Sequence, residues 1–296
     1  MVMRKATNIS LILMLGGALL SRQPASALGS ENGDQKAVLK TASATTADIP
    51  FDTADHSAEQ KLLELANQSR QKSGAPPLTF DPGLARAARI HAQAMLDAAQ
   101  LSHQFDGEPP LAQRLAATTN LQLDQEGENV AFDYDAERGH EHLMLSAPHR
   151  ANLLNPAYNV VGLGVVRSGD RLYIVEDFGH ALPSYSVDDV KEHIAAAVSD
   201  VRRQAAQPEL QRMDQLVVHD AACSMAQADK LGTDAVRKLA ARSTILSYTS
   251  LHPEALPSGT DAAIAGKGLQ TLSIGACYAR TPSYPTGVYW IVLALK

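Results

Sequence analysis

The sequence predicts an α+β protein, in which residues 57–180 form one layered domain and residues 185–296 form a second, smaller α+β region. Two observations lead to this class. In each region helical patterns come first, and two strand patterns joined by a turn close it. Runs of helices and runs of strands that are separated along the chain are typical of α+β layers.

The composition is that of a folded globular protein, and it argues against one class of partner. Of the 296 residues, 45% are hydrophobic and 20% are charged, with a formal net charge of -6. A chain of this length can form one large domain or two of ordinary size. Because nucleic-acid-binding domains are usually basic, the mild acidity argues against a nucleic-acid partner.

The N-terminus has the pattern of a secretory signal peptide. Arg4 and Lys5 supply a basic start, residues 9–20 form an apolar stretch, and Ala25-Ser26-Ala27 is a small-residue cleavage site. We expect residues 1–27 to be removed by cleavage after Ala27, which makes the protein secreted or periplasmic, without a stable membrane span. The alternative is an uncleaved membrane anchor, for which the apolar stretch is short.

The domain at residues 57–180 opens with helices. Residues 28–56 before it have no apolar period and predict a flexible leader. Ser57-Ala-Glu-Gln60 resembles a capping box that begins a helix. A second helix begins at Asp81-Pro82, and a short third one contains Arg114. The second helix carries an apolar stripe at helical spacing, formed by Leu84, Ala87, Ala88, His91, Ala92 and Met95.

The same domain closes with a short helix and a hairpin. Gly127 to Ala131 is a loop or the start of a strand, and residues 135–145 predict another helix. Ser146 is expected to be the N-cap of a further turn of helix. Two strands, at residues 160–166 and 172–178, are joined by a turn at Ser168-Gly-Asp170. Within the second strand, Leu172, Ile174 and Phe178 are expected to face one way, and Tyr173 and Val175 the other.

The region at residues 185–296 repeats this order of elements. Helices are expected at residues 189–205 and 214–231, and strands at residues 272–279 and 288–295. Two helices at the start and a hairpin at the close suggest a divergent internal duplication. The alternative is an unrelated α+β tail.

Cys223 and Cys277 are the only cysteines. In an exported protein two cysteines suggest one disulfide, and the alternative is two buried thiols. If the region is a repeat, Cys223 lies on its second helix and Cys277 on a strand that packs against that helix, so a bond is geometrically reasonable.

The first domain concentrates groups that could carry chemistry. Two histidines and a carboxylate that converge would suit a divalent cation or acid/base catalysis. Each candidate also has a structural interpretation: His91 and His140 lie on apolar helix faces, His103 follows a helix end, and Glu128 lies in a turn. Glu141 and His142 are expected to face solvent. The candidates are His91, His103, Glu128, His140, Glu141, His142, His149 and His180.

An ordered set of motifs resembles the bacterial branch of the CAP superfamily, which includes cysteine-rich secretory, antigen five and pathogenesis-related proteins. The main matches are Gly127-Glu128-Asn129-Val-Ala and Ser146-Ala-Pro-His149-Arg150-Ala-Asn152-Leu-Leu. Supporting matches are Leu101-Ser102-His103, His140 with Leu143-Met144, Val161-Gly-Leu-Gly-Val165 and Val175-Glu-Asp-Phe178-Gly.

The resemblance implies an α-β-α sandwich with a shallow cleft of two histidines and two glutamates, which in the family sometimes holds zinc or another divalent cation. His103 and His149 match the two histidines, and Glu128 matches the first glutamate. Ser146 stands where the second glutamate is expected, and Glu141 is a helical turn or more away. With one carboxylate missing, metal binding by His103, Glu128 and His149 should be weakened, although three ligands and a water can hold zinc.

The resemblance therefore implies an exported binding protein, with His149 in the cleft and Arg150 and Asn152 holding the turn. Its partner would be a small ligand, for example a lipid, or an envelope or extracellular protein. Two alternatives stay open. One is a secreted hydrolase in which His103 or His149 is the general base and Glu128 orients it. The other is a structural module of the cell envelope with a vestigial cleft.

Overall fold

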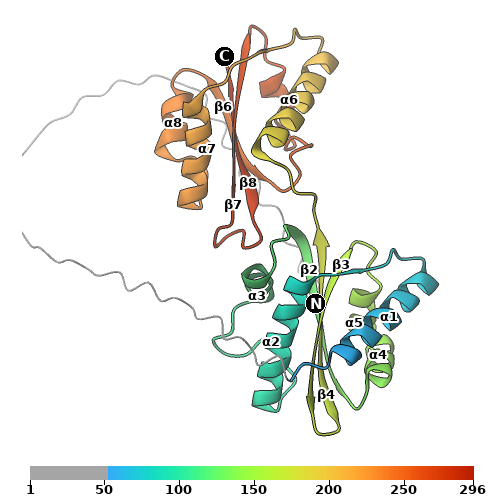
Figure 1. Cartoon of the computed structure of the whole chain (residues 1–296). Helices are drawn as coiled ribbons and strands as arrows, with labels where there is room; N and C mark the ends of the chain where they lie inside the picture. The colour runs from blue at the N-terminus through green and yellow to red at the C-terminus, as the bar shows by residue number, and fades with distance from the viewer. Residues whose placement is uncertain (1–52) are drawn as a thin grey trace, which may run out of the picture.

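The structure is a computed structural model that describes residues 53–296, and within them it contains two four-stranded sheets (Figure 1). The expected signal peptide and the leader as far as residue 52 lie outside the described residues. The first unit consists of α1 (His56–Ser73), β1 (Thr79–Phe80), α2 (Pro82–Ala98), α3 (Leu111–Thr118), β2 (Leu123–Asp133), α4 (Ala136–Leu145), α5 (Ala147–Leu153), β3 (Val160–Ser168) and β4 (Arg171–Ala181). The second unit consists of α6 (Val187–Gln204), β5 (Gln211–Arg212), α7 (Leu216–Ala228), α8 (Asp234–Ala240), β6 (Thr244–Ser250), α9 (Asp261–Ile264), β7 (Thr271–Ala279) and β8 (Val288–Leu295). The α+β class predicted from the sequence is confirmed.

The sheet of the first unit lies between two layers of helices. Its strand order is β1-β3-β4-β2, with β1 parallel to β3 and the other neighbours antiparallel. Side chains of β4 alternate between the two faces, as predicted. Leu172, Ile174 and Phe178 pack in one cluster with residues of α1, α4 and α5. Tyr173 and Val175 pack in another with residues of α2, so the unit is an α-β-α sandwich.

Helix α2 lies very close to the sheet. Every residue of its predicted apolar stripe is buried. A Cβ atom at Gly162 would lie 2.1 Å from the carbonyl carbon of Leu84, and one at Gly164 would lie 2.2 Å from that of Ala88. Only glycine allows the backbones of β3 and α2 to approach this closely. This contact fixes the helix whose C-terminal end leads into the loop that carries His103.

The start of the first unit differs from the prediction. Asp55 is the N-cap of α1, so the capping box expected at Ser57-Ala-Glu-Gln60 is wrong. Ala54 pairs with Val166, and Arg167 donates two hydrogen bonds to the Asp55 carboxylate. The end of the expected leader therefore belongs to the fold. Because Arg167 is far away in the sequence, the local pattern could not show this contact.

Two smaller predictions near β2 and α5 also change. Gly127 to Ala131 lie in the middle of β2, where they pair with β4, and do not form a loop. Ser146 is the N-cap residue of α5, but its side chain makes no capping hydrogen bond. Pro148 lies in the first turn of α5, where proline is well tolerated.

The second unit has the strand order β5-β7-β8-β6, with the same parallel and antiparallel neighbours as the first sheet. Two contacts occur in both units. Arg70 and Arg202 each donate from Nε to the carbonyl of a proline six residues later. Gly164 and Gly275 each place a β-strand against the backbone of a helix, α2 and α7 respectively. The sequence predicted no element where β6 and α8 lie.

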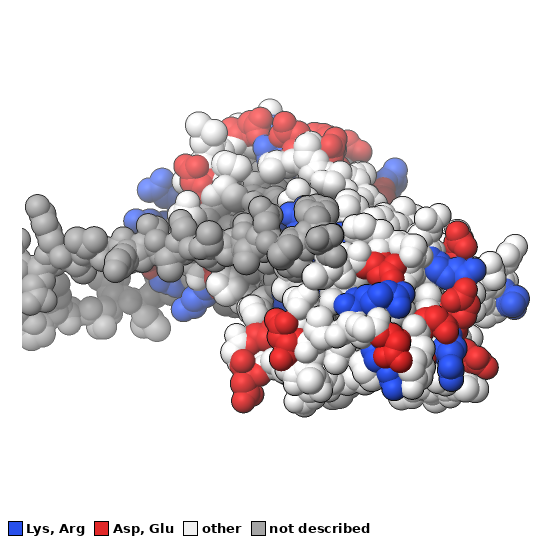
Figure 2. Space-filling view, turned by 60° about the horizontal axis from the view of Figure 1, so that its bottom comes forward, with Lys and Arg blue, Asp and Glu red and all other residues white. Residues whose placement is uncertain are grey.

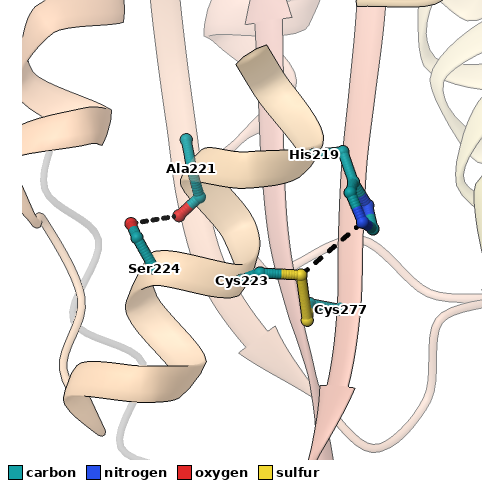
Figure 3. The surroundings of a disulfide bond; sticks show 5 residues. All are labelled: His219, Ala221, Cys223, Ser224 and Cys277. Atoms are coloured by element: carbon teal, nitrogen blue, oxygen red, sulfur yellow. Dashed lines mark hydrogen bonds between the residues drawn. A yellow bond between two sulfur atoms is a disulfide. The ribbon is translucent and has the colours of Figure 1, made fainter. Parts of the chain in front are cut away.

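The predicted disulfide is confirmed. Cys223 on α7 is bonded to Cys277 on β7, with 5.1 Å between the two Cα atoms. Figure 3 shows the bond between the helix and the strand that packs against it. The bond therefore ties one helical layer of the second unit to its sheet.

Hydrogen bonds connect the two units directly. Arg280 of the second unit donates to the carbonyl oxygens of Ala116 and Thr119, at 2.8 and 2.7 Å. Thr286 donates from its hydroxyl to the carbonyl of Leu123, at 3.0 Å. These contacts place the second unit beside α3 and the start of β2.

The surface shown in Figure 2 carries charges of both signs. On its lower right part, acidic and basic side chains lie close to one another and alternate. Among residues 53–296, no helix combines the length and the apolar character needed to span a membrane.

Candidate functional site

Two histidines that are far apart in the sequence meet at the edge of the first sheet. His103 lies in the loop after α2, and His149 lies on α5. The centroids of their rings are 6.5 Å apart, and the ring planes are tilted by 46°. The side chain of His103 is 57% exposed, so a ligand can reach it. We call the surface around His103, Glu128 and His149 the histidine cleft.

Glu128 lies behind His103 and is held on both of its oxygens. It is buried on β2, the edge strand of the sheet. Its Oε1 accepts a hydrogen bond from Nδ1 of His103 at 2.9 Å, and its Oε2 accepts one from Nη2 of Arg114 at 2.7 Å. The same Nη2 also donates to the carbonyl of His103, at 3.1 Å. Arg114 therefore neutralises Glu128 and fixes the loop that carries His103.

The arrangement determines which nitrogen of His103 faces the cleft. A carboxylate only accepts hydrogen bonds, so Nδ1 of His103 must carry a proton. When the ring is neutral, Nε2 then has a free lone pair. The same carboxylate–imidazole arrangement orients metal-binding and catalytic histidines in proteins.

Two buried asparagines link the backbone of α5 at His149 to β2. Asn129 donates from its side-chain amide to the carbonyl of His149 and to the carboxylate of Glu176, at 3.1 and 3.0 Å. Asn152 donates to the carbonyl of Glu128 and to the side chain of Asn129, at 3.1 and 3.0 Å. The Gly-Glu-Asn motif and the His-Arg-Ala-Asn motif are therefore in direct contact with each other.

The other predicted members of the site have supporting or peripheral positions. Arg150 donates to the carbonyl of Met144 at 2.8 Å, which braces the junction between α4 and α5. Ser146 lies at this junction, and Glu141 is exposed on α4. Neither supplies a carboxylate that faces the two histidines.

Burial lowers the pKa of His149. Desolvation is the main cause, and the neighbouring His103 adds to it. A lowered pKa favours the neutral imidazole near neutral pH. His149 is therefore an acceptor or a ligand under these conditions and does not act as a fixed positive charge.

Two acidic residues of β4, Glu176 and Asp177, lie beneath the site. Both Glu176 and Asp177 are fully buried. Burial raises the pKa of Glu176 to about 7, although the hydrogen bond from Asn129 opposes this. Burial and the Glu128 carboxylate beside it raise the pKa of Asp177 well above its usual value. Asp177 is therefore harder to ionise than an ordinary aspartate, although the nearby charge of Arg114 opposes part of this effect.

His91 is a core residue, as its place on the apolar stripe of α2 predicts. It is fully buried, with Nδ1 2.7 Å from Glu108 and Nε2 2.8 Å from the carbonyl of Ser102. It therefore supports the loop on which His103 lies. His140, His142 and His180 contact Ser69, Asp133 and Asp124, respectively, and are not part of the cleft.

The residues present do not fit a metal ion held by His103, Glu128 and His149. Within the described part of the chain, no group of three or more His, Cys, Asp or Glu side chains is arranged to hold a metal. The physical reason is that both oxygens of Glu128 are taken by His103 and Arg114. Only the two imidazoles remain as ligands, so the three-residue metal set predicted from the sequence is not formed.

Sequence reasoning missed most of the support behind the cleft. Arg114 entered the prediction as a residue of the third helix, the Glu176-Asp177 pair only as part of a motif, and Glu108 was not singled out. One signal was available for the pair, since two adjacent acidic residues interrupt an otherwise apolar strand. A large cavity of about 1460 Å³ between the two units is a separate feature, and none of His103, Glu128 and His149 lines it.

Comparison with known proteins identifies the first unit. Residues 63–178 match the model of the CAP family, described as the cysteine-rich secretory protein family. The uncharacterized protein YkwD of Bacillus subtilis is 34% identical over 128 residues, which cover 42% of this chain and 48% of that protein. The chain thus spans about half the length of this curated relative.

Two solved structures are also similar. One is an extracellular protein with an SCP domain from Bacillus anthracis, with 27% identity, a TM-score of 0.39, and coverage of 43% of this chain and 41% of that one. The other is Na-ASP-1, with 9% identity, a TM-score of 0.43, and coverage of 84% of this chain and 91% of that one. The domain at residues 63–178 is therefore a CAP domain of the bacterial SCP-like branch.

Proposed function

We propose that this CAP protein is exported and binds a ligand or a partner protein at the histidine cleft. The signal-peptide pattern at residues 1–27 supports export. The related Bacillus anthracis protein is described as extracellular, which agrees with this localisation.

The observation that carries the proposal is the meeting of His103 and His149 at a ring distance of 6.5 Å. The ring of His103 is fixed by its hydrogen bond with the buried Glu128, and the backbone carbonyl of His149 on α5 accepts a hydrogen bond from the buried Asn129. Packing alone does not require two polar rings to be held in this way at a surface. Binding sites are usually largely pre-formed, with a small number of precisely placed polar groups that fix the orientation of the ligand.

The chemistry of the cleft favours a ligand that donates hydrogen bonds. In its neutral form His103 presents the lone pair of Nε2, and the lowered pKa of His149 favours its neutral ring. Hydroxyl, amide and ammonium groups donate to such acceptors. A small molecule with these groups, a lipid with a hydroxylated headgroup, or a segment of an envelope protein fits this chemistry.

Purification of the exported protein, followed by mass spectrometry, tests the proposal. We expect molecules to co-purify with the parent and to be lost or strongly reduced in His103→Ala and His149→Ala. His142→Ala is the matched control, because His142 is an exposed histidine of the same domain that contacts only Asp133. Identical co-purified material in all four proteins would refute binding at the cleft.

A hydrolase is the second candidate, and the Glu128–His103 pair favours it. The carboxylate holds Nδ1–H and leaves Nε2 in the position of a general base. A screen against fluorogenic peptides and esters tests this candidate. Turnover by the parent that is lost in His103→Ala, and retained in His142→Ala, would favour the enzyme over the binding protein.

We also propose that the second unit is a degenerate copy of the first that lacks a cleft. The shared strand order and the paired contacts of Arg70 with Arg202 and of Gly164 with Gly275 support a common origin. With the two glycines aligned, the β2–β4 pair Glu128 and Asp177 corresponds to the β6–β8 pair Ile245 and Ala294. Aliphatic residues thus replace the buried acids, which suits a structural or partner-binding role.

A further inference from the structure

The disulfide of the second unit has a histidine beside it that the cleft does not use. His219 and Cys223 are one helical turn apart on α7, and Cys277 faces them from β7 (Figure 3). Nε2 of His219 lies 3.6 Å from Sγ of Cys223. All three side chains are partly exposed, so solvent and small reagents reach them.

The distance between His219 and Cys223 matches that of two ligands on one tetrahedral metal ion. Zinc–sulfur and zinc–nitrogen bonds are about 2.3 and 2.0 Å long, which places sulfur and nitrogen about 3.5 Å apart at a tetrahedral angle. The imidazole nitrogen that faces the sulfur is Nε2. The other nitrogen, Nδ1, is buried and has no hydrogen-bond partner within the described residues.

We propose that reduction of the Cys223–Cys277 disulfide uncovers a zinc site made of the two cysteine thiolates and the imidazole of His219. In the oxidised protein the two sulfurs are bonded to each other and cannot both bind a metal. Once the bond is broken, they separate to van der Waals contact at about 3.8 Å, which is also the spacing of two thiolates on one tetrahedral zinc. Two thiolates and one imidazole form a soft ligand set that selects zinc over calcium or magnesium.

The chemistry balances with a dithiol as the reductant. One thiolate of the dithiol attacks a sulfur of the disulfide, and its second thiol resolves the mixed disulfide. The dithiol becomes a disulfide, while two electrons and two protons pass to Cys223 and Cys277. Zinc then binds the two thiolates and releases the two thiol protons.

The site would respond to the redox state of the surroundings. In an oxidising compartment the disulfide is stable and no metal binds. In the presence of a dithiol reductant the same residues bind zinc through three protein ligands. The fourth position is left to water or to a group from a partner, as in zinc sites that are not purely structural.

Titration with cobalt(II) as a spectroscopic probe tests the proposal. The full-length mature protein is reduced with dithiothreitol, desalted without oxygen and titrated. Because Cys223 and Cys277 are the only cysteines of the chain, a thiolate-to-cobalt absorption band reports on this site alone. We expect one cobalt ion per reduced chain, displacement by zinc, and no band in the oxidised protein.

Variants and a measure of folding make the test decisive. His219→Ala should weaken cobalt binding by at least about tenfold, since even outer-shell partners of a metal contribute this much. His252→Ala, which removes an exposed histidine of the same unit, should leave binding unchanged. Near-UV circular dichroism of Trp290 reports whether the reduced unit stays folded. The proposal is overturned by a reduced, folded protein without the band, by a band that His219→Ala does not weaken, or by loss of the Trp290 signal on reduction.

Discussion

The buried carboxyl group of Glu176 should make the stability of the CAP domain depend on pH. Burial raises its pKa from 4.5 to about 7, and only the hydrogen bond from Asn129 opposes this rise within residues 53–296. Between these two values the folded state binds a proton that the unfolded state has released, so the free energy of unfolding falls as the pH rises. Below pH 4.5 the buried carboxyl group does not lower the free energy of unfolding. Well above pH 7 it lowers this free energy by the full amount.

The size of the effect follows from the shift. A difference of about 2.5 pKa units, at about 1.4 kcal/mol per unit, corresponds to roughly 3 kcal/mol. Glu176→Gln is nearly isosteric and always neutral, and its amide oxygen still accepts the hydrogen bond from Asn129. Relative to the parent, this variant should therefore gain about 3 kcal/mol between pH 4.5 and pH 8.5.

Native-state hydrogen exchange of the β3 and β4 amides, corrected for intrinsic rates, measures this difference. Fluorescence of Trp290 is unsuitable, because the only tryptophan of the chain lies in the second unit. Glu64→Gln is the matched control, since Glu64 is exposed on α1 and should show no pH-dependent difference. An equal stability difference between Glu176→Gln and the parent at both pH values would refute the reasoning.

Three further predictions concern the packing and charges around the cleft. Gly164→Ala places a Cβ 2.2 Å from the α2 backbone. The free energy of unfolding, measured by urea denaturation, should therefore fall by about 1–3 kcal/mol. An unchanged value would contradict the close contact between β3 and α2. Arg114→Met leaves the buried charge of Glu128 without its cation and should destabilise the domain by about 3–5 kcal/mol, whereas the double variant with Glu128→Gln should recover much of this loss. Calorimetric titration of the oxidised protein with zinc should give a dissociation constant weaker than about 1 µM, because only two imidazoles are available. Tighter binding that is lost in His149→Ala would contradict this view of the cleft.

Local patterns predicted the elements well where a single face is buried. The stripe of α2 and the alternation along β4 follow directly from the spacing of apolar residues. The N-cap of α1 is Asp55, and the two hydrogen bonds that its carboxylate accepts from Arg167 of β3 cannot be seen in the local pattern. Strand β6 was missed for the same reason, since its pairing with β8 joins distant parts of the chain.

The cleft was predicted from motif order and not from geometry. Nothing in the spacing of His103 and His149 shows that their rings meet, and only the resemblance brought them together. The sequence could not show which groups contact the carboxylate of Glu128, because Arg114 and Asp177 come from distant elements, α3 and β4. These contacts turn an expected metal ligand into a carboxylate that orients a histidine.

The histidine ring nitrogens, observed by ¹H–¹⁵N NMR in the full-length protein, test the central claim most directly. The account predicts that neutral His103 carries its proton on Nδ1, because it donates to Glu128, and that His103 and His149 show a ring-to-ring nuclear Overhauser effect. Addition of the co-purified material should shift both sets of signals and leave those of His142 in place. A neutral His103 protonated on Nε2, or signals of His103 and His149 that respond independently of each other, would contradict a shared binding cleft.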